Sequence, residues 1–108
     1  MPAYPRLRAG GKNFYPFRLA TTSFIYPDHM APNVRMLGPF VDEVELLFFE
    51  SSHPDSLPRQ AEIRELADLA VEHQITYNIH LPRDLSLSHR PPARRDTAIE
   101  TLKTIFEL

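Results

Sequence analysis

The chain alternates three short apolar segments with three helical patterns, and this order restricts the folds open to it. The apolar segments span residues 18–23, 41–50 and 75–81. Apolar side chains at helical spacing follow each segment, at residues 32–37, 58–73 and 94–107. Strands that alternate with helices form parallel sheets joined by crossover helices. We therefore expect an α/β fold of order βαβαβα with parallel strands.

The middle apolar segment is the strongest strand prediction. Its apolar side chains run almost without a break, as in a strand that is buried on both faces; they are Val41, Val44, Leu46, Leu47, Phe48 and Phe49. Asp42, Glu43 and Glu45 lie at its start, which we expect to face water. After the second helix, Gln74 stands where glycine often ends a helix, so we expect a strained turn there.

Composition excludes several classes of protein. A chain of 108 residues allows one small domain. Its net charge of −2 gives no electrostatic case for a nucleic-acid partner or an anionic membrane. No apolar run reaches the roughly 18 residues that a membrane span requires, and the first residues lack the apolar core of a signal peptide. We expect a cytoplasmic protein.

The absence of cysteine excludes disulfides and cysteine-bound zinc. Residues 1–17 contain three prolines and Gly10-Gly11, which predicts an extended N-terminal arm with solvated basic side chains. Residues 18–108 then form the folded domain.

Several strings of residues resemble one family. They are Thr21-Thr22-Ser23 with Tyr26-Pro27, Val41–Leu46 with Phe49-Glu50, and His80-Leu81-Pro82. The chain resembles the N-terminal part of the cobamide-remodelling phosphodiesterases, which are xylose-isomerase-like TIM barrels of AP endonuclease family 2. This resemblance implies a metal-dependent hydrolase, with zinc as the expected metal, that cleaves the phosphodiester in the nucleotide loop of a corrinoid.

The resemblance covers about residues 18–108 but only the first three strand–helix units of a barrel. A TIM barrel has eight such units and about 250 residues. We therefore expect an incomplete barrel that is inactive alone, either a fragment or a truncated gene product. Isolated copies should associate as homo-oligomers, since a three-stranded sheet has two open edges.

Two residues are candidate metal ligands. In endonuclease IV relatives the third strand supplies a histidine to a zinc cluster, and His80 matches that position. Glu50, at the end of the middle strand, matches an acidic residue that faces the site in relatives. The alternatives are a core histidine bonded to a neighbouring carbonyl and a solvated glutamate. His53 could join Glu50 at a metal, although a loop histidine is more often exposed.

Four residues are candidate substrate contacts. Arg83, Arg94 and Arg95 flank the loop after the third strand, and the fork of arginine matches phosphate oxygens. Tyr26, after the first strand, could contact the same substrate. A charged surface loop is the simpler interpretation of the arginines.

Two other functions remain open from the sequence. A sugar-phosphate isomerase or epimerase of the same superfamily would bind a smaller substrate and usually one divalent ion. The third possibility is a non-catalytic fragment that self-associates.

Overall fold

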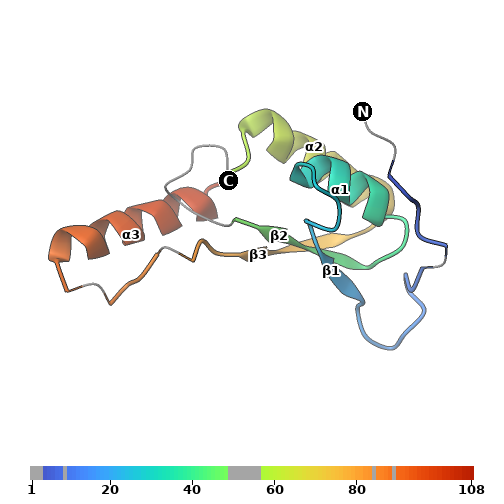
Figure 1. The fold of residues 1–108 in the computed structure, drawn as a ribbon, viewed down its shortest axis with the longest axis horizontal. Helices are drawn as coiled ribbons and strands as arrows, with labels where there is room; N and C mark the ends of the chain where they lie inside the picture. Colours follow the sequence, from blue (N-terminus) through green and yellow to red (C-terminus); the bar gives the residue numbers. More distant parts are fainter. Residues whose placement is uncertain (1–3, 9, 49–56, 84, 89) are drawn as a thin grey trace.

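The computed structural model describes residues 4–8, 10–48, 57–83, 85–88 and 90–108. Strands and helices alternate along the chain (Figure 1), so the predicted α/β order is confirmed. The elements are β1 (Ala20–Thr22), α1 (Met30–Leu37), β2 (Glu43–Leu47), α2 (Gln60–His73), β3 (Thr76–His80) and α3 (Pro92–Phe106).

The three strands form one parallel sheet in the order β1-β2-β3. Thr22 pairs with Glu45 across β1 and β2, and Leu47 pairs with His80 across β2 and β3. All three carboxyl ends therefore lie at one end of the sheet, as the alternation of strands and helices predicted.

One face of the sheet is apolar and carries helices. Successive side chains of a strand point to opposite faces, and on β2 Val44 and Leu46 are buried in one core together with Val34 of α1 and Leu66 of α2. Helices α1 and α2 lie side by side over this face (Figure 1). An ion pair between Arg35 and Glu65 also joins these two helices.

The opposite face of the sheet is polar near the start of the strands. Glu43 accepts hydrogen bonds from the hydroxyl of Thr76 at 2.7 Å and from the amide of Asn78 at 3.0 Å. These bonds, the Thr76 bond foremost, hold the pKa of Glu43 below its ordinary value. Arg18 donates to the Thr76 hydroxyl at 2.8 Å, so the network spans the sheet.

The prediction that Asp42 faces water is wrong, because its side chain is only 3% exposed. Its carboxylate accepts hydrogen bonds from the backbone N–H of Leu19 and of Asn13, both at 2.8 Å. Lys12 nearby donates to the carbonyls of Gly38 and Val41, so this basic side chain is anchored rather than solvated.

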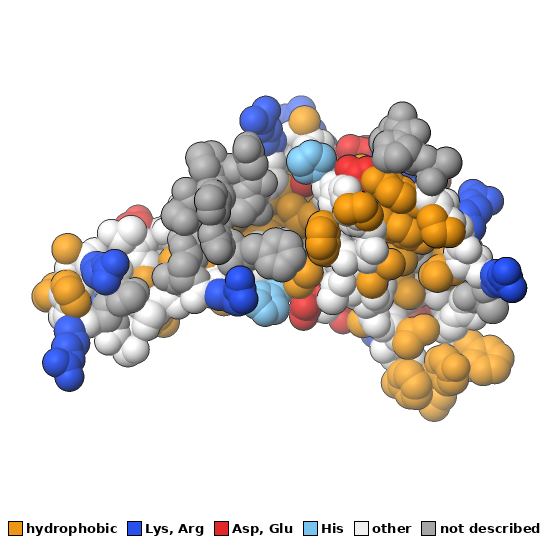
Figure 2. All heavy atoms as spheres, in the orientation of Figure 1, with side chains coloured by type: hydrophobic (Ala, Val, Ile, Leu, Met, Phe, Trp, Pro, Cys, Tyr) orange, Lys and Arg blue, Asp and Glu red, His pale blue; other side chains and the backbone are white. Residues whose placement is uncertain are grey.

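The described part of the arm contains no helix or strand, yet it is held at two places. Tyr4 stacks on Tyr26 with ring centroids 5.0 Å apart, and the N–H of Asn13 bonds to Asp42. The turn between Asn13 and β1 carries exposed aromatic side chains, Phe14, Tyr15 and Phe17. A group of hydrophobic atoms at the lower right of Figure 2 marks this end of the molecule.

Helix α3 extends from the sheet as a separate arm of the molecule (Figure 1). The radius of gyration is 15.7 Å, against about 13 Å for a compact domain of this length. Among the described residues of α3, Ile105 in the last turn is 1% exposed and belongs to the hydrophobic core. Ala98, near the middle of the helix, is also buried. Among the described residues, no helix is both long and apolar enough to cross a membrane.

Gln74 ends α2 in the left-handed conformation, with φ 53° and ψ 46°. The strained turn predicted at this position is confirmed. Its backbone N–H bonds back to Val71 in the last turn of the helix, which partly offsets the cost of the conformation.

Candidate functional site

His80 lies at the carboxyl end of β3, on the sheet face that α1 and α2 leave uncovered. The register places it opposite Leu47, and its carbonyl accepts a hydrogen bond from the N–H of Phe48 at 3.1 Å. Its side chain is exposed, so the alternative of a core histidine does not hold.

The ring of His80 is oriented by one hydrogen bond. Its Nδ1 lies 2.9 Å from the carbonyl oxygen of Leu81. A carbonyl can only accept, so Nδ1 carries the proton in this bond and Nε2 keeps a lone pair in the neutral ring. Metal-binding histidines commonly have this arrangement, in which a backbone carbonyl fixes the tautomer.

Glu45 is a further candidate for a metal ligand, which the sequence alone did not reveal. It pairs with Asn78 in the register, two residues before His80 on the neighbouring strand, so both side chains lie on the same face. Its side chain is half-buried, unlike a glutamate at a solvated strand start. The alternation of acidic and apolar residues through Glu43, Val44, Glu45 and Leu46 was the signal for this shared face.

The other two predicted metal ligands, Glu50 and His53, lie outside the described residues. Within the part of the chain that the structure describes, no three histidine or acidic side chains are close enough to hold a metal together. A zinc site takes at least three protein ligands, so a zinc ion bound by His80 would need further ligands from outside the described residues.

Tyr26 has a buried ring, and its hydroxyl donates to the carbonyl of Pro5 at 2.8 Å. In this structure it supports the arm.

Arg83 is exposed after β3. Arg94 and Arg95 belong to the first turn of α3, at the end of that helix farther from the core (Figure 1). Arg95 donates to the carbonyl of Arg90 at 3.1 Å. A substrate role for these four residues stays a prediction.

A scan of protein-family models, a search of curated proteins and a search of solved structures each found no match to this chain. The chemistry of the site therefore has to be argued from its own residues.

Proposed function

We propose that this chain contributes one side of a metal-dependent phosphodiesterase site, with His80 as a metal ligand. The observation that carries the proposal is the orientation of the imidazole. Its Nδ1 is held by the Leu81 carbonyl, and its Nε2 is left with a lone pair at the carboxyl end of the sheet. Ligand sites of parallel α/β folds gather at that end.

Glu45 supports the same proposal. Its carboxylate lies on the face that carries His80, and parallel strands bring such neighbours within reach of a shared ion or water. The remaining ligands would come from Glu50 or from segments beyond the described residues. When bound, a zinc ion would lower the pKa of a water ligand to about 7 and polarise a phosphoryl oxygen.

The proposed reaction is hydrolysis of a phosphodiester, with the nucleotide loop of a corrinoid as the substrate that the family resemblance suggests. Water would attack phosphorus and the alkoxide of one ester would leave. The substrate would approach the polar face of the sheet, since α1 and α2 cover the other face. A cytoplasmic location is part of this proposal.

Zinc titration by calorimetry tests the ligand role of His80. We expect His80→Asn to weaken zinc binding by about tenfold or more, the loss seen when one ligand or its support is removed. His29→Asn is the matched control, because His29 lies before α1 in a different loop. Equal zinc affinity in the His80 variant and the wild type would reject the ligand role.

Incubation with cobalamin, followed by mass spectrometry of the products, tests the reaction. Because this chain contributes only one side of the site, we expect the 108-residue chain alone to leave cobalamin intact. We expect a zinc-loaded gene product that also supplies the remaining ligands to hydrolyse one phosphoester bond of the nucleotide loop. Intact cobalamin in that second experiment, despite bound zinc, would reject the phosphodiesterase activity and leave the ligand role of His80 in place.

A further inference from the structure

A cavity of about 470 Å³ opens where α1 and α2 begin. Its volume lies in the range of small-molecule sites, which is about 300–1,000 Å³. It lies between His29, just before α1, and the residues just before and in the first turn of α2. Helices that follow parallel strands begin near the carboxyl ends of those strands, so the cavity lies toward that end of the sheet. The residues that line it are His29, Leu57, Pro58, Arg59, Ala61 and Glu62.

The wall formed by His29 is held by a buried amide. The side chain of Asn33 is fully buried and accepts hydrogen bonds from the N–H groups of Ile25 and Tyr26. Its amide nitrogen lies 2.9 Å from the carbonyl oxygen of His29 and within hydrogen-bond distance of two further loop carbonyls. The backbone under His29 is therefore fixed before any ligand arrives.

The opposite wall is held by helix packing. Arg59 immediately precedes α2 and Glu62 lies in its first turn. Helix α2 is in turn joined to α1 by the ion pair between Arg35 and Glu65. The two walls thus belong to one packed layer, which favours a site of constant shape.

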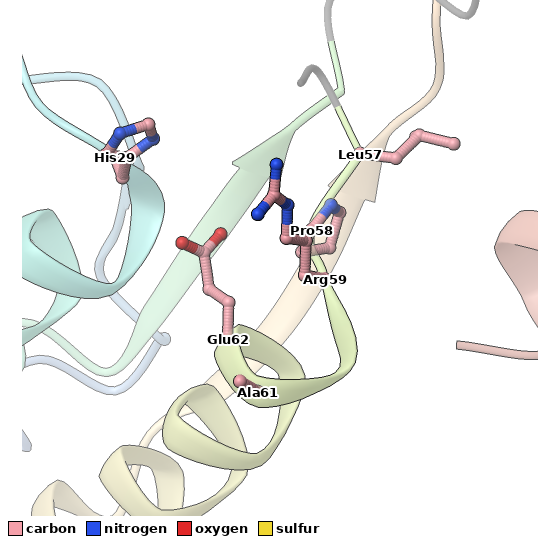
Figure 3. Close-up of a pocket in the computed structure, with 6 residues that line it drawn as sticks. All are labelled: His29, Leu57, Pro58, Arg59, Ala61 and Glu62. Carbon is pink, nitrogen blue, oxygen red and sulfur yellow. The ribbon is translucent and has the colours of Figure 1, made fainter. Parts of the chain in front are cut away.

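Three polar and three apolar residues line the cavity. Figure 3 shows the guanidinium of Arg59 and the carboxylate of Glu62 near one another, with the His29 ring across the space from them. Leu57, Pro58 and Ala61 supply the apolar part. Arg59 already takes part in another interaction, but a guanidinium has five N–H donors and can bind an oxyanion as well.

The pairing of these groups restricts the ligand chemistry. The arginine fork matches the oxygens of a phosphate or carboxylate. An ionised carboxylate can only accept, so Glu62 suits a hydroxyl group on the same ligand. A bare anion would meet repulsion from Glu62, whereas an anion with neighbouring hydroxyls would satisfy both side chains.

We propose that this cavity binds the phosphate monoester of a short polyol, with the phosphate on Arg59 and a hydroxyl on Glu62. The aromatic ring nitrogen of His29 would contact the phosphate from the other wall. This site uses none of the residues proposed for the metal, so either proposal can fail without the other.

Nuclear magnetic resonance titration of the whole 108-residue chain tests it, with glycerol 3-phosphate, inorganic phosphate and glycerol as probes. We expect saturable shifts for residues around the cavity, and tighter binding of glycerol 3-phosphate than of either other probe. Arg59→Gln should lower the affinity for glycerol 3-phosphate by about tenfold or more, the usual effect of losing a charge-assisted hydrogen bond.

Glu62→Gln separates the two contacts. We expect it to reduce the preference for glycerol 3-phosphate over inorganic phosphate, because the repulsion of a bare anion is removed together with the charge. Arg64→Gln is the matched control: it removes an exposed arginine of α2 that does not line the cavity. Failure to saturate, equal effects of the Arg59 and Arg64 variants, or an unchanged preference in the Glu62 variant would each overturn the proposal.

Discussion

The carboxylate of Asp42 accepts a hydrogen bond from the backbone N–H of Asn13 at 2.8 Å, which fixes the N-terminal arm to the start of β2. A second bond from Leu19 holds the segment just before β1. One buried side chain thus anchors two irregular parts of the chain, which form no strand-to-strand hydrogen bonds with one another.

Replacement of Asp42 by Asn should therefore loosen the arm. The amide keeps one acceptor oxygen but loses the charge and the second acceptor, so one of the two N–H groups is left without its partner. We expect faster tryptic cleavage after Lys12 in the variant, measured by mass spectrometry over time. Asp68→Asn, an exposed position on α2, is the control. Equal cleavage rates in the variant and the wild type would contradict the anchoring role.

Acid should destabilise the folded chain through Asp42 and Glu43. Hydrogen bonds from the Leu19 and Asn13 N–H groups lower the pKa of Asp42, and bonds from Thr76 and Asn78 lower that of Glu43. Both groups are then more acidic in the folded chain than their ordinary values of 3.8 and 4.5. Their stabilisation is complete above those values and is lost as pH falls through the lower folded pKa values.

Urea unfolding at pH 7, 5, 4 and 3 measures this effect. We expect a nearly constant free energy of unfolding down to about pH 5 and a decrease below it. The decrease should be smaller in Asp42→Asn, which has one fewer shifted group. A steeper loss in that variant than in the wild type would count against the assignment.

Alanine at Asn33 should be among the most destabilising changes in the chain. It removes the acceptor for two backbone N–H groups and the donor for three carbonyls in the loop before α1. We expect a loss of about 3 kcal/mol, since each buried group left without a partner costs about 1–3 kcal/mol. Thermal and urea unfolding measure it. Asn78→Ala, a half-buried position, should cost much less.

Glycine at Gln74 should stabilise the protein. A left-handed conformation costs a residue with a side chain about 1 kcal/mol, and glycine avoids that cost. We expect Gln74→Gly to raise the free energy of unfolding by about that amount, and Gln74→Ala to leave it nearly unchanged. A destabilised glycine variant would show that the Gln74 side chain has a further role.

The hydroxyl of Tyr77 should ionise at a higher pH than an ordinary tyrosine. Burial raises its pKa to about 12 from the ordinary value of 10.0, and its hydroxyl donates to the carbonyl of Leu66 at 2.6 Å. The folded state therefore loses stability as pH rises from about 10 through 12. Absorbance at alkaline pH should show an ionisation that Tyr77→Phe removes, together with a loss of about 1 kcal/mol for the hydrogen bond.

The regular elements could be predicted because their signals are local. Helix α2 follows from the spacing of Ile63, Leu66 and Ala70. The strain at its end follows from Gln74, which occupies a position where glycine often ends a helix. These outcomes depend only on side chains that are close in the sequence.

The parts that could not be predicted depend on irregular backbone. Asp42 is buried because Asn13 and Leu19 present N–H groups to it, and no periodicity marks such groups. Asn33 of α1 is buried for the same reason, because its amide bonds to backbone groups of the irregular loop before that helix. The position of α3 also escaped prediction, because an apolar stripe shows that a helix packs somewhere and not where.

The middle position of β2 has a consequence for the chain as it leaves the ribosome. Neither outer strand pairs with the other, so every interstrand bond of the sheet involves β2. β1 precedes β2 in the chain, so the two strands can pair as soon as β2 has emerged. The second edge of β2 pairs only with β3, which follows the whole of α2. While only the residues before β3 have emerged from the ribosome, β2 is therefore an apolar strand with one unpaired edge, a state prone to association with other chains.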